Sequence, residues 1–395
     1  MREGQGDRTM AQGMHTAQVY VVDRDSEGVI RQALNDLGVQ DAEFVQGTVE
    51  MATHTLAKQP SPRLLIVDVS GVDDPVMRLG ALAEVCEPNT GVLVIGDRND
   101  IILYRDLKAK GVVEYFFKPL ISDLVARACS GILTGAAADQ AARTGKLVLV
   151  LGVRGGVGAT MIAVNTAWYL AVTRQRWVML LDLDLQSGDA ALQLNVNPSH
   201  ALSEAFEHPE RVDKLFLERA VVHVESRFDL LASLEPLGEA LPLSEGAVLA
   251  VLENVLRRYR FVFVDVPVTL APALTSVLHL PSVCVLVSDG GLVAARDVAR
   301  WRERIGPNSP ERTTLHILNK AGGPGSLPEA EFNRAAGKPP DMIIPYDADL
   351  AAAVNLGIKV TQESPVLKRG LAPLLRQLAG EPMPKERSLL ARIFG

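Results

Sequence analysis

Cysteine is scarce in this chain, and the few cysteines present form no recognisable motif. The 395 residues include 3 cysteines, Cys86, Cys129 and Cys284, which are widely spaced and belong to no CxxC or Cys/His pattern. Disulfide frameworks and structural zinc sites both depend on such patterns. The sequence therefore predicts buried core thiols in a protein of a reducing compartment.

Long apolar runs and an excess of one charge are also missing. No apolar stretch reaches the length that spans a bilayer, and residues 1–17 are polar, without the apolar centre of a signal peptide. With 40 basic and 47 acidic side chains, the formal net charge is −7, which gives no general attraction to nucleic acid. We therefore expect a cytoplasmic protein with no specific nucleic-acid partner.

Apolar residues, in contrast, are abundant enough for two cores. They make up 48% of a chain that is longer than a single core usually supports. Small residues and glycines between 130 and 145 are typical of a linker. The predicted organisation is a disordered segment 1–17, a first domain 18–135, a linker 136–145, a second domain 146–380 and a C-terminal tail 381–395.

The first domain alternates short apolar runs with helical patterns. Its apolar runs predict buried strands at 18–22, 63–67, 91–95 and 112–117, and 29–37 has helical spacing. Repeated strand and helix units close most readily into a doubly wound parallel sheet. Because the carboxyl ends of such strands meet at one edge, we expect Asp23 and Asp68 to lie together there.

This arrangement resembles a response-regulator receiver domain, which has a flavodoxin-like α/β fold. Asp68 matches the phosphoacceptor, and Lys118 matches the lysine that steadies the phosphoryl group. Two positions depart from the family: Arg24 follows Asp23 where a second magnesium-binding acid belongs, and Gly96 stands where the switch serine or threonine belongs. Because Mg²⁺ needs its carboxylates, these departures favour a pseudo-receiver used for docking or dimerisation. A phosphorylatable receiver is the alternative.

The second domain opens with the order strand, glycine loop and helix. The apolar run 146–151 predicts a strand and 161–171 predicts a helix, and between them lies Gly152-Val-Arg-Gly-Gly-Val-Gly-Ala-Thr160. Glycines let backbone N–H groups surround an anion, and a helix N-terminus attracts it. The pattern indicates a phosphate-binding loop in a second doubly wound α/β domain. A plain glycine-rich turn is the alternative.

The loop resembles the deviant Walker A motif of the ParA/MinD ATPases, Lys-Gly-Gly-Val-Gly-Lys-Thr. The resemblance implies ATP and Mg²⁺ as cofactors, with nucleotide contacts from Arg154, Gly155, Gly156, Val157, Gly158, Ala159 and Thr160. Arg154 stands at the first lysine of the motif, and Ala159 replaces the second lysine, which normally reaches the β- and γ-phosphates. We therefore expect ATP binding to survive and fast hydrolysis to be lost.

Later segments match the same family in order, and the resemblance extends over about residues 146–370. It implies that Asp184 orients the attacking water, with Asp182 in support, and that Thr160 and Asp265 hold Mg²⁺. Segments 315–320 and 343–347 resemble those that enclose the nucleotide base, which assigns Asn319, Pro345 and Asp347 to the site. The alternative for the aspartates at 182, 184 and 189 is that they only cap the following helix or lie in a solvent-exposed loop, since aspartate is common at such places.

The last residues, 385–395, have the pattern of an amphipathic helix. Leu389, Leu390, Ile393 and Phe394 share one face, and the segment resembles the membrane tail of MinD. Two such tails in a dimer would bind the inner membrane surface together. A terminal helix packed on its own domain is the alternative.

The order of the two domains, together with the missing loop lysine, resembles the TadZ/CpaE proteins of tight-adherence (Flp, type IVc) pilus systems. The resemblance implies an ATP-binding homodimer that marks a polar or membrane site. It also implies recruitment of the pilus secretion ATPase and the inner-membrane platform proteins. Two alternatives remain open: an active ParA/MinD-type ATPase in partitioning or positioning, and a phosphorylation-responsive output protein.

Overall fold

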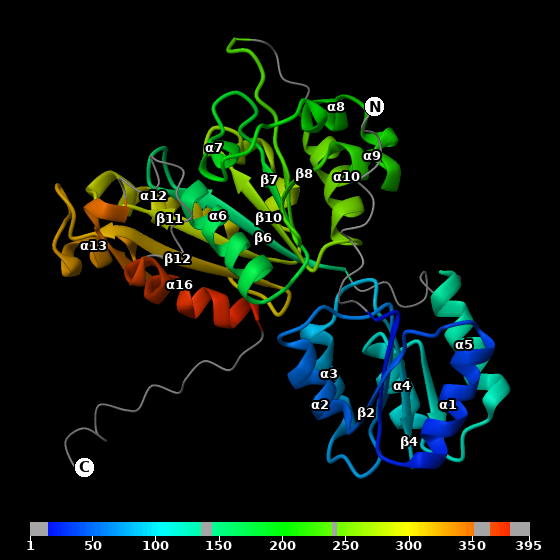
Figure 1. The fold of residues 1–395 in the computed structure, drawn as a ribbon. Coiled ribbons are helices and arrows are strands. Elements are labelled where there is room, and N and C mark those ends of the chain that lie inside the picture. The colour runs from blue at the N-terminus through cyan, green and yellow to red at the C-terminus, as the bar shows by residue number, and fades with distance from the viewer. Residues whose placement is uncertain (1–14, 136–143, 239–242, 351–363, 380–395) are drawn as a thin grey trace, which may run out of the picture. The chain divides into compact units, whose positions relative to one another are not determined.

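The computed structural model describes residues 15–135, 144–238, 243–350 and 364–379. The chain divides into two compact units (Figure 1). The first unit runs to Gly145 and includes the short segments Arg174–Trp177 and Val255–Arg260, and the second unit contains the rest. The predicted tail 381–395 and most of the predicted linker lie outside the described residues.

The first unit is built on a parallel five-stranded sheet. The strand order is β2-β1-β3-β4-β5, which is the flavodoxin-like order. The strands are β1 (Ala17–Val21), β2 (Glu43–Gln46), β3 (Leu64–Asp68), β4 (Gly91–Gly96) and β5 (Glu114–Phe117). The sequence did not predict β2, because this short edge strand is only partly buried and carries no apolar run. Ala17, placed in the disordered segment by the sequence, is the buried first residue of β1.

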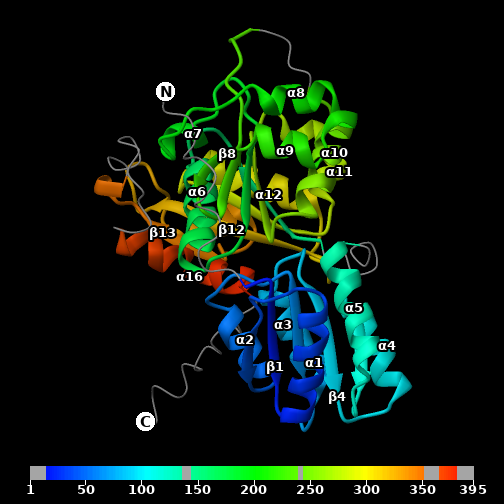
Figure 2. The same cartoon turned by 45° about the vertical axis from the view of Figure 1, so that its right-hand side comes forward.

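Helices cover both faces of this sheet (Figure 2). They are α1 (Arg24–Asp36), α2 (Val49–Leu56), α3 (Pro75–Val85), α4 (Ile101–Ala109) and α5 (Ser122–Thr134). Alternate strand residues point to opposite faces. Accordingly, Val19 and Ile66 pack under α1 and α5, whereas Tyr20 and Leu65 pack under α2, α3 and α4.

The second unit contains an eight-stranded sheet in the order β13-β12-β11-β6-β10-β7-β9-β8. All neighbours are parallel except β8 and β9. The strands are β6 (Lys146–Gly152), β7 (Val178–Asp182), β8 (Val222–Glu225), β9 (Phe228–Leu231), β10 (Phe261–Val266), β11 (Ser282–Ser288), β12 (Arg312–Ala321) and β13 (Met342–Pro345).

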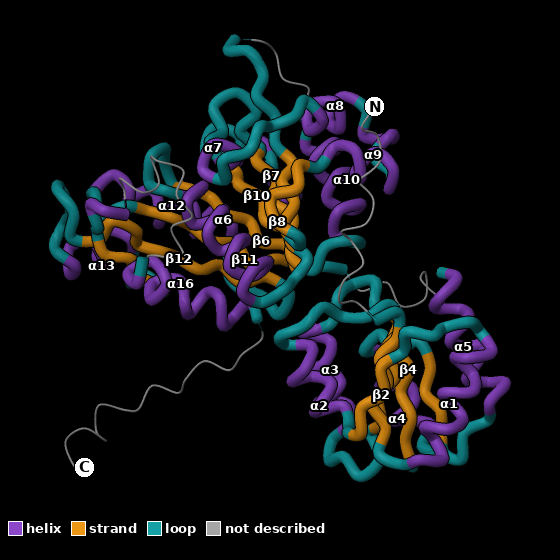
Figure 3. Tube along the Cα trace, viewed as in Figure 1, coloured by secondary structure: helices purple, strands orange, loops and turns teal. Residues whose placement is uncertain are grey.

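Helices flank this second sheet as well (Figure 3). Helices α6 (Ala159–Trp168), α7 (Ala190–Gln193) and α16 (Pro365–Leu378) pack on one apolar core with the sheet. A π-helical turn, Tyr169–Thr173, extends α6. The remaining helices are α8 (Ala201–Glu207), α9 (Lys214–Ala220), α10 (Glu245–Leu256), α11 (Thr275–Leu278), α12 (Leu292–Ile305) and α13 (Glu329–Ala336), with short 3₁₀ turns at Pro209–Arg211 and Ala271–Ala273.

The predicted fold class, two α/β units on doubly wound parallel sheets, is confirmed, with β8 as the antiparallel exception. Cys86, Cys129 and Cys284 are buried and form no disulfide with one another, as predicted for core thiols. Burial raises the thiol pKa of Cys129 and of Cys284 to about 12, so neither is reactive at neutral pH. Among the helices that the structure describes, none has the length and apolarity needed to cross a bilayer.

Candidate functional site

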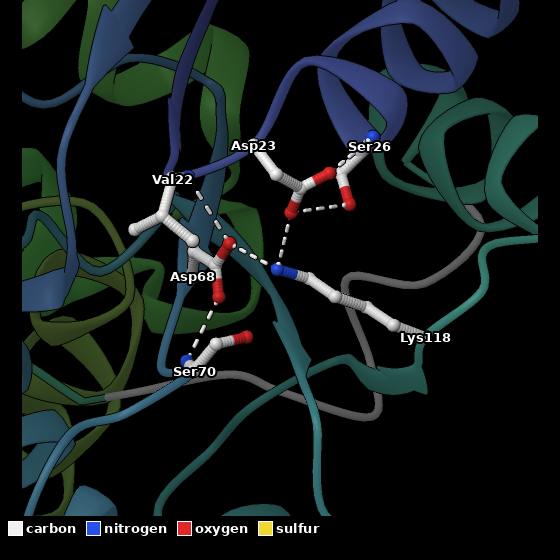
Figure 4. Close-up of polar contacts among 6 residues, drawn as sticks. All are labelled: Val22, Asp23, Ser26, Asp68, Ser70 and Lys118. Carbon is white, nitrogen blue, oxygen red and sulfur yellow. Dashed lines mark hydrogen bonds and ion pairs between the residues drawn. The ribbon is translucent and has the colours of Figure 1, made fainter.

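The carboxyl edge of the first sheet brings together Asp23, Asp68 and Lys118. The Lys118 ammonium donates to Oδ2 of Asp23 and to Oδ2 of Asp68, each at 2.6 Å (Figure 4). Asp68 ends β3, Asp23 follows β1, and Lys118 follows β5. The topology therefore assembles the predicted receiver-like trio from three separate strands.

Every side-chain oxygen of this trio is engaged. Asp68 is fully buried; its Oδ1 accepts from Ser70 N at 2.8 Å, and its Oδ2 also accepts from Val22 N at 3.2 Å. Asp23 caps α1 by accepting from Ser26 N at 2.7 Å. Burial opposes ionisation of Asp23 and of Lys118. The hydrogen bonds outweigh this effect, so the pKa of Asp23 is lowered and the pKa of Lys118 is raised. The Lys118 ammonium thus lies between the two carboxylates and balances their negative charge.

Gly96 leaves no room for the side chain that a receiver switch position carries. A Cβ at Gly96 would lie 2.7 Å from the hydroxyl oxygen of Tyr115 and 3.1 Å from Val69 Cγ2. The Tyr115 hydroxyl is fixed there because it donates to Arg98 O at 2.7 Å. A serine or threonine at position 96 would therefore require Tyr115 to move.

The predicted phosphate loop joins β6 to α6 in the second unit. Gly156 and Gly158 have φ of +78° and +91°, a region that favours glycine. A Cβ at Gly158 would lie 2.6 Å from Asn319 Nδ2, whereas one at Gly155 or Gly156 would meet open space. Arg154, Gly155 and Gly156 are exposed, Val157 is buried, and Ala159 and Thr160 are half-buried at the start of α6. The loop thus presents an open, glycine-lined turn at a helix N-terminus.

Two buried aspartates lie on neighbouring strands, and one of them, Asp265, contacts Thr160 at the start of α6. Asp182 ends β7 and pairs in register with Asp265 on the adjacent strand β10. Burial, and then the negative charges of the neighbouring aspartates, raise the pKa of Asp182 to about 7 and that of Asp265 to about 8. A hydrogen bond from the Thr160 side chain partly offsets this rise at Asp265. The predicted magnesium pair, Thr160 and Asp265, is therefore in contact.

Asp182, expected from the sequence to have only a supporting role, lies beside the predicted magnesium ligand Asp265. Its Oδ1 accepts from Asp184 N at 3.1 Å and its Oδ2 from Ala190 N at 3.3 Å. Asp184 is half-buried, and its Oδ1 accepts from Ser187 N at 2.9 Å, which closes a turn. Asp189 accepts from the side chain of Gln193 at 2.9 Å. Asp182 thus holds the turn 184–190 through both carboxylate oxygens while lying in register with Asp265, whereas Asp184 and Asp189 bond only to Ser187 and Gln193 nearby in sequence.

The end of β12 contacts the loop through two consecutive residues. Asn319 Nδ2 donates to Val157 O, and Lys320 Nζ donates to Gly156 O, both at 2.8 Å. Asn319, expected from the resemblance near the base, thus lies against the phosphate loop itself. The resemblance segment included Lys320 without assigning it a role, and the signal that could have marked it is a cation next to a predicted loop-contacting residue.

Pro345 and Asp347 lie after this region and do not reach the loop through any hydrogen bond within the described residues. Pro345 ends β13 and pairs with Ala321. Asp347 Oδ1 accepts from Asp349 N at 3.0 Å and from Leu350 N at 3.2 Å, so it caps the following turn. Their predicted place beside the nucleotide base stays a prediction.

The residues present fit a Mg²⁺-nucleotide in all but one respect. Mg²⁺ usually binds one or two carboxylates and the substrate phosphates while keeping several waters, so the oxygen set of Thr160, Asp265 and Asp182 suits it. Among the described side chains, no group of three or more His, Cys, Asp and Glu forms a metal cage of its own. The open glycine turn suits phosphate. The exception is Ala159, which supplies no charge.

No protein-family model matches the sequence, and no curated protein sequence matches it either. Solved structures do match. A ParA family ATPase from Chlorobium tepidum is 22% identical, covers 59% of this chain and 98% of its own, and has a TM-score of 0.52. The cell division ATPase MinD from Pyrococcus furiosus is 19% identical over 60% of this chain and 97% of its own, with a TM-score of 0.48.

A pilus assembly protein CpaE from Caulobacter crescentus is 32% identical over 31% of this chain and 96% of its own, with a TM-score of 0.28. Among these structures, the ParA family ATPase is the one whose likeness establishes a shared fold. The parallel sheet, the glycine loop between β6 and α6, and the carboxylates at the ends of β7 and β10 belong to that fold in this chain. The chain therefore contains the α/β P-loop fold of the ParA family ATPases.

Proposed function

We propose that this chain is an ATP-binding localisation and scaffold protein of a tight-adherence (Flp, type IVc) pilus assembly system. Two copies dimerise on Mg²⁺-ATP, mark a polar site on the inner membrane surface, and recruit the secretion ATPase and the platform proteins there. The C-terminal segment 381–395 contributes the membrane contact. The pilus assignment rests on the order of the two domains and on the altered loop.

The observation that carries ATP binding is the arrangement of Thr160, Asp265 and the loop 152–160 without a lysine at Ala159. The helix N-terminus, the glycine turn and the magnesium oxygens support binding of a nucleotide. Because the lysine is absent, the transition state of phosphoryl transfer lacks a charge that it normally has. Binding energy therefore stabilises a dimer rather than driving turnover.

Light scattering of the full-length protein with and without Mg²⁺-ATP tests this function. The expected result is a monomer that becomes a dimer with ATP, and a weaker shift in Arg154→Ala, since Arg154 is exposed and keeps the charge of the family's first lysine. The exposed Arg105→Ala in α4 serves as the matched control. An unchanged mass at saturating ATP contradicts ATP-dependent dimerisation.

An active positioning ATPase is the second candidate, and one observation favours it. Asp184 lies two residues beyond Asp182, which ends β7 and pairs with Asp265. A group that orients the attacking water would be needed close to this pair. Steady-state phosphate release separates the two functions. Turnover that disappears in Asp184→Ala supports the ATPase, and no release above the buffer rate supports the scaffold.

A phosphorylation-responsive output protein is the third candidate, and the contacts of Asp68 argue against it. Its carboxylate is fully buried and is held by Lys118, Val22 N and Ser70 N. The Asp68 oxygens that would attack a phosphoryl donor are therefore already hydrogen-bonded. The second carboxylate that would help to bind Mg²⁺ is replaced by Arg24. We expect no labelling by acetyl phosphate with Mg²⁺, whereas stoichiometric labelling lost in Asp68→Asn would support this candidate.

A further inference from the structure

Two consecutive side chains at the end of β12 hold two consecutive carbonyl groups of the phosphate loop. Asn319 donates to Val157 O and Lys320 donates to Gly156 O, both at 2.8 Å. Neighbouring residues of a regular strand point to opposite faces, so a regular β12 could not bring both side chains to one loop. The strand must depart from regular geometry between them.

That departure is present at Lys320. Its φ is +56°, in the left-handed region that lysine rarely adopts, and the pairing of β12 with β13 shifts register between Leu318 and Ala321. The bend is fixed by Gly323 N donating to Lys320 O at 3.1 Å and by Tyr346 N donating to Ala321 O at 2.9 Å. Such a backbone state costs about 1 kcal/mol and persists where the surroundings hold it, often at functional sites.

The bend delivers a positive charge to a loop whose position 159 is the uncharged Ala159. The Lys320 side chain is exposed, and among the described residues no carboxylate pairs with its ammonium, which rests on a neutral carbonyl. The loop it touches is the one where Ala159 has no charge to offer. A bound phosphate would therefore be the first anion that this ammonium meets.

We propose that Lys320 supplies to a phosphate in the loop 152–160 the cation that Ala159 lacks. The inference rests on the proposed nucleotide binding and names the residue that makes it possible. The ammonium exchanges the Gly156 carbonyl for a phosphate oxygen, a short movement for a flexible four-carbon stem. Lys320 acts on the loop of its own chain.

Calorimetric titration of Mg²⁺-ATP into the full-length protein tests this role. Lys320→Met keeps most of the stem and removes the charge, and a charge-assisted hydrogen bond to phosphate corresponds to a loss of affinity of about tenfold to a hundredfold. Lys320→Arg should retain more affinity than Lys320→Met. Lys338→Met, at another exposed lysine of the second unit, should bind as the wild type does.

Two further measurements show whether Lys320 supplies a charge to the phosphate or only stabilises the loop. Ala159→Lys should restore ATP affinity in the Lys320→Met background, because it returns the cation to the family's position. The melting temperature of the unliganded Lys320→Met protein should equal that of the wild type. A lowered melting temperature without rescue by Ala159→Lys would overturn the inference and assign Lys320 to loop structure alone.

The outcomes also distinguish this inference from the proposed function. If the wild type binds ATP and Lys320→Met binds it equally well, the inference fails and the nucleotide site stands. If the wild type binds no ATP, both fail together.

Discussion

Asp182 and Asp265 occupy matching register positions on the neighbouring strands β7 and β10, and both carboxyl groups are buried. Burial raises the pKa of both side chains well above the ordinary 3.8, to about 7 and about 8. The folded protein without metal therefore holds protons at neutral pH that the unfolded chain releases. A cation bound at the pair would displace those protons.

This pair predicts a pH dependence of stability. Since the folded-state pKa values lie above the unfolded ones, the pair favours folding at low pH, and this contribution is lost as the pH rises toward 8. Each proton held only by the folded state is worth about 1.4 kcal/mol per pH unit, so we expect the free energy of unfolding without Mg²⁺ to fall by about 5 kcal/mol from pH 5.5 to pH 8. Urea titrations across that range measure it.

Asp265→Asn should flatten that dependence, because an amide cannot ionise. The exposed Asp349→Asn serves as the control and should follow the wild type. A wild-type stability that rises over the same range would contradict the raised pKa values of the pair.

Removing the Lys118 ammonium should lower the stability of the first unit markedly. Lys118→Met leaves the buried Asp68 carboxylate without its ammonium partner, and breaking a buried ion pair from one side costs about 3 kcal/mol. The exposed Lys58→Met should change the unfolding free energy by less than about 0.5 kcal/mol. Equal stabilities of the two variants in urea would show that the bridge contributes nothing.

Gly96 and Tyr115 should be coupled. Gly96→Ala places a Cβ 2.7 Å from the Tyr115 hydroxyl oxygen, so we expect a loss of about 2 kcal/mol. Tyr115→Phe removes that oxygen and should recover part of the loss, which a double-mutant cycle measures. Gly80→Ala in α3 meets no atom within 4 Å and should be neutral or stabilising. Strict additivity of the Gly96 and Tyr115 changes would contradict the coupling.

Gly158 should be far less tolerant than Gly155. Gly158→Ala combines a φ of +91° with a Cβ 2.6 Å from Asn319 Nδ2, so it should break the bond to Val157 O and cost about 2 kcal/mol. Gly155→Ala meets open space and should leave stability unchanged. Thermal melts of both variants measure the difference in stability. A Gly158→Ala protein that melts at the wild-type temperature would mean that the loop adjusts without cost.

Local patterns predicted much of the fold and only part of the site. The apolar run ending at Gly152 and the glycines before Thr160 are adjacent in sequence, so strand, loop and helix could be expected together. The pairing of Asp182 with Asp265 depends on the placing of β10 beside β7, which no local pattern encodes. Likewise, the contact of Lys320 with Gly156 arises from an irregularity in a strand far along the chain.

Calorimetric titration of ATP with Mg²⁺ into the wild-type full-length protein tests the central claim most directly, namely that a loop with Ala159 in place of lysine still holds a nucleotide. We expect saturable binding with a micromolar dissociation constant that disappears when Mg²⁺ is removed. The absence of heat at millimolar ATP would contradict it, and would leave the P-loop fold of this chain as a scaffold that works without nucleotide.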